Sequence, residues 1–591
     1  MTGKALPVAW GNLATVDHPR LVIGNAATHP SLASRLKYVS DLKGADDDVL
    51  NQSYLIASDI HEDHISINAL GFGRKRAARE MLGMSYALGD LLRRLDIRGG
   101  TWGFILPKKT IIEKPVTPNR RLYLMNTFYI NPGLALERFD EKQINDYVDM
   151  LVDAHYSQVT FFQWSTSYLY PGSFESLRPL TEMTHRAMRL FFDRARKRGM
   201  QVYQMITPAH IEPGLISSDA RFGAKGFYIG QGACWSQPEV RDLAGKVAQL
   251  EMEYYMPVDG CTVWFYDPGG CFCSECKPNQ ADRIFDQLRL IDTLSKTVSP
   301  GAKMEAVLWP TWVFHETKGI DYTKANVDAL VKSFLDKCLS RFGSRNMAVM
   351  DAATVDNSNI YNGLVNSKDF LRNGLLHGVM GATIEQAYPF AALRFAYTLE
   401  QVAKMQKHNL EAGTLTIGYA STNIPTVYTF ADALYDGESP GDHSIRQYAA
   451  SVAKGDSFKP YLALLLADDA LYQSRSYKEM DTAITQMETQ LKLIEKSRKF
   501  FGDKDWLRGF VKAQRWYWKL AQAPDENAFD TILSQFKIDV GSIPMYSDYM
   551  SGYGKVNKSM VAYAAGRHVM MYWRSLAGDA SSVGTADNIR H

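Results

Sequence analysis

Short apolar segments alternate with longer amphipathic segments over most of the chain. From about residue 120 to residue 424, a strand-like segment, a loop and a helix-like segment follow one another eight times. The predicted strands begin at residues 121, 158, 201, 260, 303, 346, 378 and 413. Strands that alternate with helices in this way are expected to run parallel. Eight such units favour an α/β fold with a closed (β/α)₈ TIM barrel over an open doubly wound sheet.

A different pattern precedes this repeat. Residues 20–25, 53–58 and 63–70 read as short strands, and residues 79–95 place apolar side chains on one face of an amphipathic helix. These elements predict a small N-terminal α/β domain. Residues 111–121 contain two prolines and are expected to form a linker to the barrel.

The pattern changes again after about residue 430, where strand-like segments give way to helical ones. Residues 476–500 place apolar side chains at alternating spacings of three and four, and residues 506–523 are also helix-like. Such a stripe is expected to pack against other helices. The predicted organisation is therefore an N-terminal α/β domain, a catalytic barrel and a helical C-terminal domain, with boundaries at 1–115, 116–430 and 431–591.

Composition and charge narrow the function classes. The 591 residues include 66 Lys and Arg and 64 Asp and Glu, a net charge of +2, so we expect no nucleic-acid partner. The longest apolar run, residues 461–467, is far shorter than the about 20 residues that span a bilayer, so we expect no membrane span. The first residues show no apolar segment or cleavage pattern, so we expect no signal peptide in the chain as written. Localisation stays open: cytoplasmic as the chain is written, or periplasmic or secreted if a leader was removed.

Functional side chains of a (β/α)₈ barrel follow the carboxyl ends of its strands. Three carboxylates do so here: Asp267 after the fourth predicted strand, Asp351 at the end of the sixth, and Glu385 after the seventh. Polar and aromatic residues that follow other strands are candidates for substrate binding; they are Asn126, Trp164, His210, Trp309, Trp312 and Tyr388.

Carboxyl groups surrounded by aromatic side chains favour hydrolysis of a glycosidic bond. One carboxyl group, kept protonated by apolar surroundings, donates a proton to the leaving oxygen, while another activates water or attacks the anomeric carbon. We expect Asp267 to be the general acid and Glu385 with Asp351 to be the base or nucleophile. The substrate would be an oligosaccharide or glycan, and no organic cofactor is needed. The alternative without enzymatic activity is a barrel that binds glycans but does not cleave them.

Four cysteines form a second candidate site. Cys271, Cys273 and Cys276 lie in a C-x-C-x-x-C run after the fourth predicted strand, and Cys234 follows the third. Neighbouring barrel loops would bring them together, and four thiolates would form a closed tetrahedral zinc site. Such a site is structural, because no position stays open for water. A disulfide with a spare thiol, a site without metal, and a redox role are the alternatives.

Several stretches resemble carbohydrate-active families. Residues 21–30 (LVIGNAATHP), 53–58 and 79–95 resemble the small α/β domain that precedes the barrel in α-glucuronidases and β-N-acetylhexosaminidases. The run MITPAHIEPG (205–214) is similar to the third-strand segment of hexosaminidases, whose histidine contacts the sugar, and His210 matches that histidine. The segments CWSQPEVRD and GGCFCSEC resemble a bacterial branch of glycoside hydrolases with a C-x-C-x-x-C loop, some of which act on N-acetylglucosaminyl linkages.

This resemblance implies a glycoside hydrolase. The α-glucuronidase layout has an acid at strand 4 and carboxylates at strands 6 and 7, which Asp267, Asp351 and Glu385 match by position, and it implies inversion. Its acid is a glutamate, whereas this chain has the shorter Asp267. Substrate-assisted hexosaminidases carry an Asp-Glu pair at strand 4, where this chain has Asp267-Pro268. An N-acetylglucosaminidase-type glycosidase is therefore the second hypothesis, and the helical tail is a candidate surface for a homo-oligomer.

Overall fold

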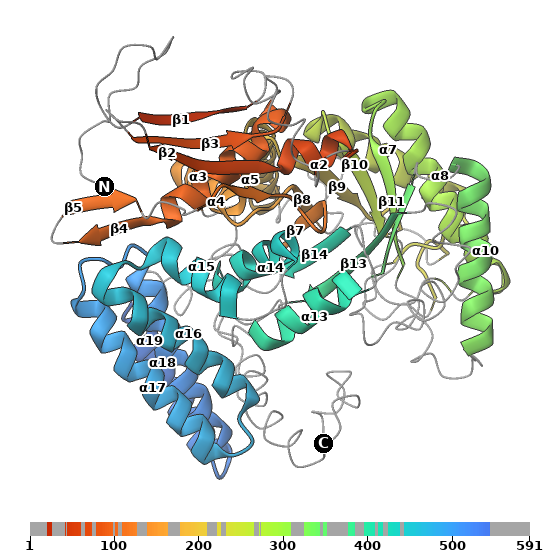
Figure 1. Cartoon of the computed structure of the whole chain (residues 1–591). Coiled ribbons are helices and arrows are strands. Elements are labelled where there is room, and N and C mark those ends of the chain that lie inside the picture. The colour runs from red at the N-terminus through yellow and green to blue at the C-terminus, as the bar shows by residue number, and fades with distance from the viewer. Residues whose placement is uncertain are drawn as a thin grey trace. The chain divides into compact units, whose positions relative to one another are not determined.

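The structure is a computed structural model of the 591-residue chain (Figure 1). It describes residues 20–25, 42, 44–60, 65–73, 78–98, 101–104, 109–126, 139–163, 178–209, 221–225, 232–264, 271, 273–308, 324–342, 347–351, 376–383, 395–407, 412–417, 424–437 and 442–543. The chain forms two compact units, Met1–Lys114 and Pro115–His591. Each unit is described by itself.

The first unit is built on a four-stranded sheet in the order β1-β3-β2-β6. β1 pairs parallel with β3, whereas β2 pairs antiparallel with β3 and with β6. A separate hairpin joins β4 and β5. The elements are β1 (Arg20–Asn25), α2 (Asp47–Gln52), β2 (Tyr54–Ile60), β3 (Ile65–Gly71), η2 (Ala78–Met81), α3 (Leu82–Arg93), β4 (Leu95–Arg98), β5 (Thr101–Phe104) and β6 (Ile111–Glu113).

Two glycines let α3 approach the sheet closely. A Cβ atom at Gly83 would lie 2.2 Å from the carbonyl oxygen of Ser53, and one at Gly71 would lie 2.4 Å from the backbone nitrogen of Met84. No side chain fits at either position, so helix and sheet meet backbone to backbone. The predicted strands and the predicted helix of this unit are confirmed. The predicted linker over 111–121 contains the boundary between the two units, but it is shorter than predicted, because its first residues form β6 and its last residues begin the next strand, β7.

The second unit contains eight parallel strands in a closed ring. Each strand pairs with its neighbours in chain order, and β14 pairs with β7 to close the sheet. The strands are β7 (Asn119–Asn126), β8 (Gln158–Gln163), β9 (Gln201–Ile206), β10 (Gly260–Trp264), β11 (Lys303–Leu308), β12 (Met347–Asp351), β13 (Leu376–Thr383) and β14 (Ala412–Ile417). The α/β class is confirmed, and all eight strands begin within two residues of the predicted positions.

Helices follow seven of the eight strands in the described part of the chain; residues 352–375, between β12 and β13, lie outside it. These helices are α4 (Glu141–Asp153), α5 (Arg178–Lys197), α7 (Pro238–Tyr255), α8 (Gln280–Val298), α10 (Lys324–Phe342), α13 (Phe395–Lys407) and α14 (Ile424–Asp436), with a short η6 (Lys277–Asn279) before α8. Local sequence fixes where α4 begins, because Asp140 and Gln143 form a capping box there.

A buried ion pair crosses the interior of the ring. Arg121 of β7 donates two hydrogen bonds to Glu305 of β11, one of them 2.7 Å long, although 184 residues separate them. β7 and β11 are four strands apart in either direction around the ring, so this contact spans its full width. Both residues are the third of their strands, which places the pair near the amino-terminal end of the barrel. Glu305 is therefore a residue of the barrel interior.

Polar side chains of neighbouring strands surround the Arg121–Glu305 pair. Together with the pair they form a buried polar layer, here called the barrel floor. Gln158 accepts hydrogen bonds from Arg121 at 2.6 and 3.0 Å, and the Thr262 hydroxyl donates to Glu305 at 2.7 Å. The guanidinium carbon of Arg121 lies 3.9 Å from the centre of the Tyr203 ring. Burial acts to lower the pKa of Arg121, but the charge of Glu305, its hydrogen bond to Arg121 and the nearby Tyr203 together outweigh burial, so the pKa is raised. Both charges are thus kept in a buried layer by nearly complete hydrogen bonding.

In the described residues after the barrel, the second unit has five further helices, with a short η7 (Gly455–Ser457) between the first two. They are α15 (Asp442–Val452), α16 (Phe458–Gln473), α17 (Tyr477–Lys496), α18 (Lys504–Ala521) and α19 (Glu526–Gly541). In α17, Met480, Ile484, Met487 and Leu491 are buried, as the stripe of apolar residues predicts. Within the described residues, none of the helices combines the length and apolar character needed to cross a membrane.

The barrel floor generates a stability prediction. Glu305→Gln should lower the free energy of unfolding by about 3 kcal/mol or more, because it leaves the buried Arg121 without its carboxylate. The double variant Arg121→Met/Glu305→Gln should recover at least about half of that loss, because it removes both charges. Denaturant unfolding of the three proteins measures the effect. A loss below about 1 kcal/mol in the single variant would show that the pair contributes little.

Candidate functional site

The carboxyl ends of the eight parallel strands share one rim of the closed sheet. Asn126 ends β7 and Asp351 ends β12, so both predicted residues belong to this rim. The register of β12 pairs Asp351 with Leu308 of β11 and with Val379 of β13. The side chains of Asn126 and Asp351 lie outside the described part of the structure.

The other predicted residues of the barrel site lie outside the described residues. They are the candidate acid Asp267, the candidate base Glu385, and the candidate sugar contacts Trp164, His210, Trp309, Trp312 and Tyr388. In the sequence, Asp267 follows the last residue of β10 by three positions, and Glu385 follows the last residue of β13 by two. Their roles stay predictions.

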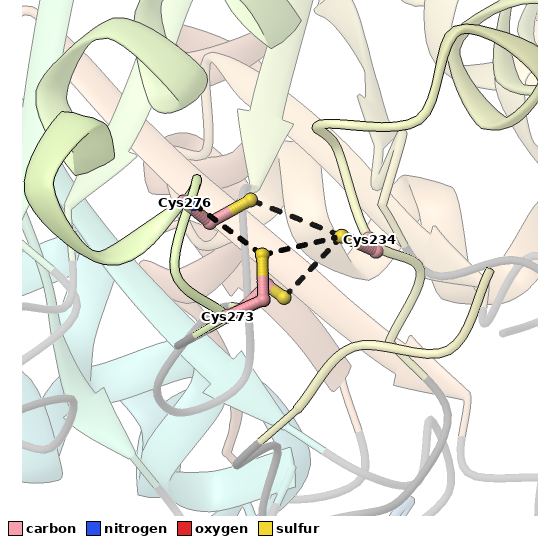
Figure 2. Close-up of side chains that lie close together, drawn as sticks. Cys234, Cys273 and Cys276 are labelled. Atoms are coloured by element: carbon pink, nitrogen blue, oxygen red, sulfur yellow. Dashed lines mark hydrogen bonds between the residues drawn. The ribbon is translucent and has the colours of Figure 1, made fainter. Parts of the chain in front are cut away.

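The four predicted metal ligands do come together, from two neighbouring loops. Cys234 lies between β9 and α7, where its backbone nitrogen donates to the carbonyl oxygen of Phe222 at 2.7 Å. Cys271, Cys273 and Cys276 lie between β10 and η6. Figure 2 shows Cys234 on one side and Cys273 and Cys276 on the other, with their sulfur atoms pointing toward one another.

The sulfur spacing matches a tetrahedral metal site. The Sγ atom of Cys234 lies 3.5 Å from that of Cys271, 3.7 Å from that of Cys273 and 3.9 Å from that of Cys276. All four Sγ atoms lie within 4.8 Å of one another. A disulfide would need about 2.05 Å, and all six cysteines of the chain are free. Zinc–sulfur bonds of about 2.3 Å place the corners of a tetrahedron about 3.8 Å apart.

The contacts within the cluster favour negative charge on one sulfur atom, that of Cys234, and raise the pKa of Cys276 well above its ordinary value. The thiols of Cys271 and Cys276 donate toward Cys234, which holds the pKa of Cys234 well below its ordinary value. The same interaction raises the pKa of Cys271 to about 11. Backbone N–H groups of Lys225 and Cys276 point at Cys271 and Cys273, each at 3.4 Å. These donors would also stabilise thiolates bound to a cation.

The cluster can hold a metal ion but is not arranged for metal-assisted catalysis. Cys234, Cys271 and Cys276 are buried, and four sulfur ligands would fill a tetrahedral shell. A metal here would join the β9–α7 loop to the β10–α8 loop. The sequence analysis did not identify Ser236, whose hydroxyl oxygen lies 3.0 Å from Cys234 Sγ. Serine carries no motif that could mark it as a neighbour of the cluster.

Comparisons with known proteins support the fold. No protein-family profile and no curated protein matches this chain. Among solved structures, one similar protein is a GH138 enzyme targeting pectin rhamnogalacturonan II, with a TM-score of 0.52 and 11% identity over 94% of this chain and 74% of that one. At this identity the likeness shows a shared fold.

A second solved structure is less similar. It is a GH20 exo-β-N-acetylglucosaminidase from Vibrio harveyi in complex with N-acetylglucosamine, with a TM-score of 0.46 and 12% identity over 77% of this chain and 75% of that one. We draw no argument from a likeness this weak.

Proposed function

We propose that the chain is a glycoside hydrolase with a complete (β/α)₈ barrel and an active site at the carboxyl rim of its strands. One observation carries the proposal: the sheet closes, so the ends of β10, β12 and β13 belong to one rim, and the sequence places a carboxylate at or just after each. The fold shared with a GH138 enzyme supports it by analogy.

The strand register supports a short separation between two of these acids. Trp264, the last residue of β10, pairs with Val307 of β11, and the next residue, Leu308, pairs with Asp351 of β12. The ends of β10 and β12 are therefore level within one residue and two strand spacings apart, about 10 Å. Asp267 follows Trp264 by only three positions. Side chains that converge from backbones this far apart can bring two carboxyl groups within the about 6.5–9.5 Å that an inverting pair needs.

In the proposed mechanism, Asp267 protonates the leaving oxygen and Glu385 with Asp351 activates the attacking water. Asn126, Trp164, His210, Trp309, Trp312 and Tyr388 are the proposed contacts to the sugars. The layout is that of an inverting α-glucuronidase, with an N-acetylglucosaminidase-type enzyme as the second candidate. Aryl glucuronides, aryl N-acetylglucosaminides and pectic oligosaccharides are the first substrates to screen, the last because the GH138 neighbour targets a pectin.

The cysteine cluster supports a second proposal, a structural zinc ion held by Cys234, Cys271, Cys273 and Cys276. The tetrahedral sulfur spacing and the all-thiolate ligand set both suit zinc. Cys271 follows Asp267 by four positions. The ion would therefore hold the loop that carries the proposed acid close to the β9–α7 loop.

Substitution of the proposed acid and base tests the activity. Asp267→Asn and Glu385→Gln should each lower kcat by about 10²-fold or more, because each removes a proton-transfer group, while the thermal unfolding temperature stays unchanged. Asp242→Asn and Glu253→Gln, on the exposed face of α7, are matched controls that should keep full activity. If both rim variants retain near-normal rates on the substrate that the wild type cleaves, the assignment is wrong.

Metal analysis tests the zinc proposal. Protein purified without chelators should contain about one zinc ion per chain by elemental analysis. Cys234→Ser and Cys276→Ser should lose it, whereas Cys338→Ala should keep it, because Cys338 is buried on α10, outside the cluster. Wild-type protein that carries no zinc and does not take it up from buffer would contradict the proposal.

A further inference from the structure

A broad groove lies on the outer surface of the barrel, between helices that follow three successive strands. Residues of α7, α8 and α10 line it, and its volume is about 1340 Å³; Figure 1 labels the three helices. This exceeds the range of about 300–1,000 Å³ that is typical of pockets for one small molecule. A ligand of several linked units would fill it better. Most of its lining residues lie on these helices, and Trp235 lies in the β9–α7 loop, whereas the proposed active site lies at the strand ends.

The groove concentrates positive charge. Two carboxylates, Asp286 and Asp336, line it together with six cations: Arg241, Arg283, Arg289, Lys332, Lys337 and Arg341. Three charged groups outside the lining pair with these or with one another, namely Asp282, Asp292 and Lys296. Counting them leaves seven cations against four carboxylates, an excess of three. The whole chain has a net charge of only +2, so this excess is local.

Two hydrogen-bond donors of the lining have no protein acceptor. The indole Nε1 of Trp235, a fully buried residue, and the Nε of Arg283 are both buried without a partner among the described residues. A buried donor left unpaired costs about 1–3 kcal/mol, so an acceptor supplied by a ligand would be favourable. Both donors thus point to a ligand rich in oxygen acceptors.

The loop that carries Cys234 also contributes a residue to the groove. Trp235 lies between Cys234 and Ser236, and Arg241 donates to the carbonyl oxygens of Trp235 and Ser236 at 2.9 and 3.3 Å. No carboxylate pairs with Arg241 among the described residues, so its charge is not cancelled by an ion pair. The tryptophan and one cation are therefore fixed before any ligand arrives.

We propose that this groove binds an acidic oligosaccharide, whose carboxylates pair with the arginine and lysine side chains. Guanidinium groups match the two oxygens of a carboxylate, and the unpaired indole N–H of Trp235, which lines the groove, is a donor for a sugar oxygen. The sugar nature of the ligand rests on the proposed glycosidase function, whereas the anionic character rests on the groove alone. The site is distinct from the catalytic rim and would retain a charged glycan near it.

Binding of an α-1,4-linked hexamer of galacturonic acid tests the proposal by isothermal titration calorimetry on the full chain. The double variant Arg289→Gln/Lys332→Gln changes two side chains that are 60% and 74% exposed, so it should fold normally. It should bind the hexamer at least about tenfold more weakly than the wild type. A neutral hexamer of glucose should bind to neither protein.

A matched control variant tests whether the lost charges must lie in the groove to affect binding. Arg186→Gln/Lys142→Gln removes one arginine and one lysine of 74% and 81% exposure, which also form ion pairs with a carboxylate on their own helices. It should bind the acidic hexamer like the wild type. Equal binding by wild type and the groove variant, or equal loss in both double variants, would overturn the proposal. Tighter binding of a polyphosphate of equal charge would also overturn it, in favour of a phosphate ligand.

The failure of this proposal is distinguishable from failure of the glycosidase proposal. Turnover of a small aryl glycoside should be unchanged in Arg289→Gln/Lys332→Gln, because these side chains lie on the helices and not at the rim. Hexamer binding that depends on Arg289 and Lys332 would support the groove even in a chain that cleaves no glycoside.

Discussion

The pair Arg121–Glu305 is the interaction on which the barrel depends most directly. The two residues come from opposite strands, so their hydrogen bonds fix the width of the ring at its amino-terminal end. Desolvation of two charges is costly, and a buried pair is tolerated only when its remaining donors and acceptors are also satisfied. Gln158 and Thr262 provide those partners from neighbouring strands. The floor is therefore a closed polar layer that only one strand register satisfies.

The two ends of the barrel differ in what their polar groups are available for. The amino-terminal end uses its polar groups for one another, so they are not free to bind a substrate. At the carboxyl end, loops follow the strands. Two of them, the β9–α7 and β10–α8 loops, meet at the cysteine cluster, where the sulfur atom of Cys234 lies 3.5 to 3.9 Å from the three sulfur atoms of the other loop. Loops that hold functional groups need such a support, because loop backbone alone does not position side chains with sub-ångström precision.

The sequence predicted the strands well for a physical reason. Parallel strands of a closed barrel are covered on both faces, so each appears as a short apolar run between polar loops. The cysteine cluster was predictable because consecutive barrel loops lie side by side. The prediction failed at Ile111–Glu113, where a three-residue edge strand is too short to leave a pattern. The ion pair was beyond reach, because no local signal links Arg121 to a residue 184 positions away.

The basic groove was equally invisible in the sequence. Five of its six lining cations are spaced along two helices, α8 and α10, about 50 residues apart, a pattern that looks like any solvated helix surface. Only the packing of α8 beside α10 turns two ordinary faces into one charged wall. The carboxylates proposed as catalytic are the opposite case, because the sequence places them at or just after strand ends while their side chains lie outside the described residues. Sequence thus identifies chemistry carried by single positions better than chemistry created by packing.

Because Asp267 is shorter than a glutamate, the proposed catalysis would depend on the proposed metal ion. Aspartate has one methylene fewer than glutamate, so its carboxyl group reaches about 1.5 Å less far from the backbone. A general acid must come within about 2.6–3.2 Å of the oxygen it protonates, and a displacement of about 1 Å can cost 10²-fold in rate. With Asp267 as the acid, the backbone itself must stand closer to the substrate and must be held there. A zinc ion bound through Cys271, four positions further along the same loop, would supply that restraint.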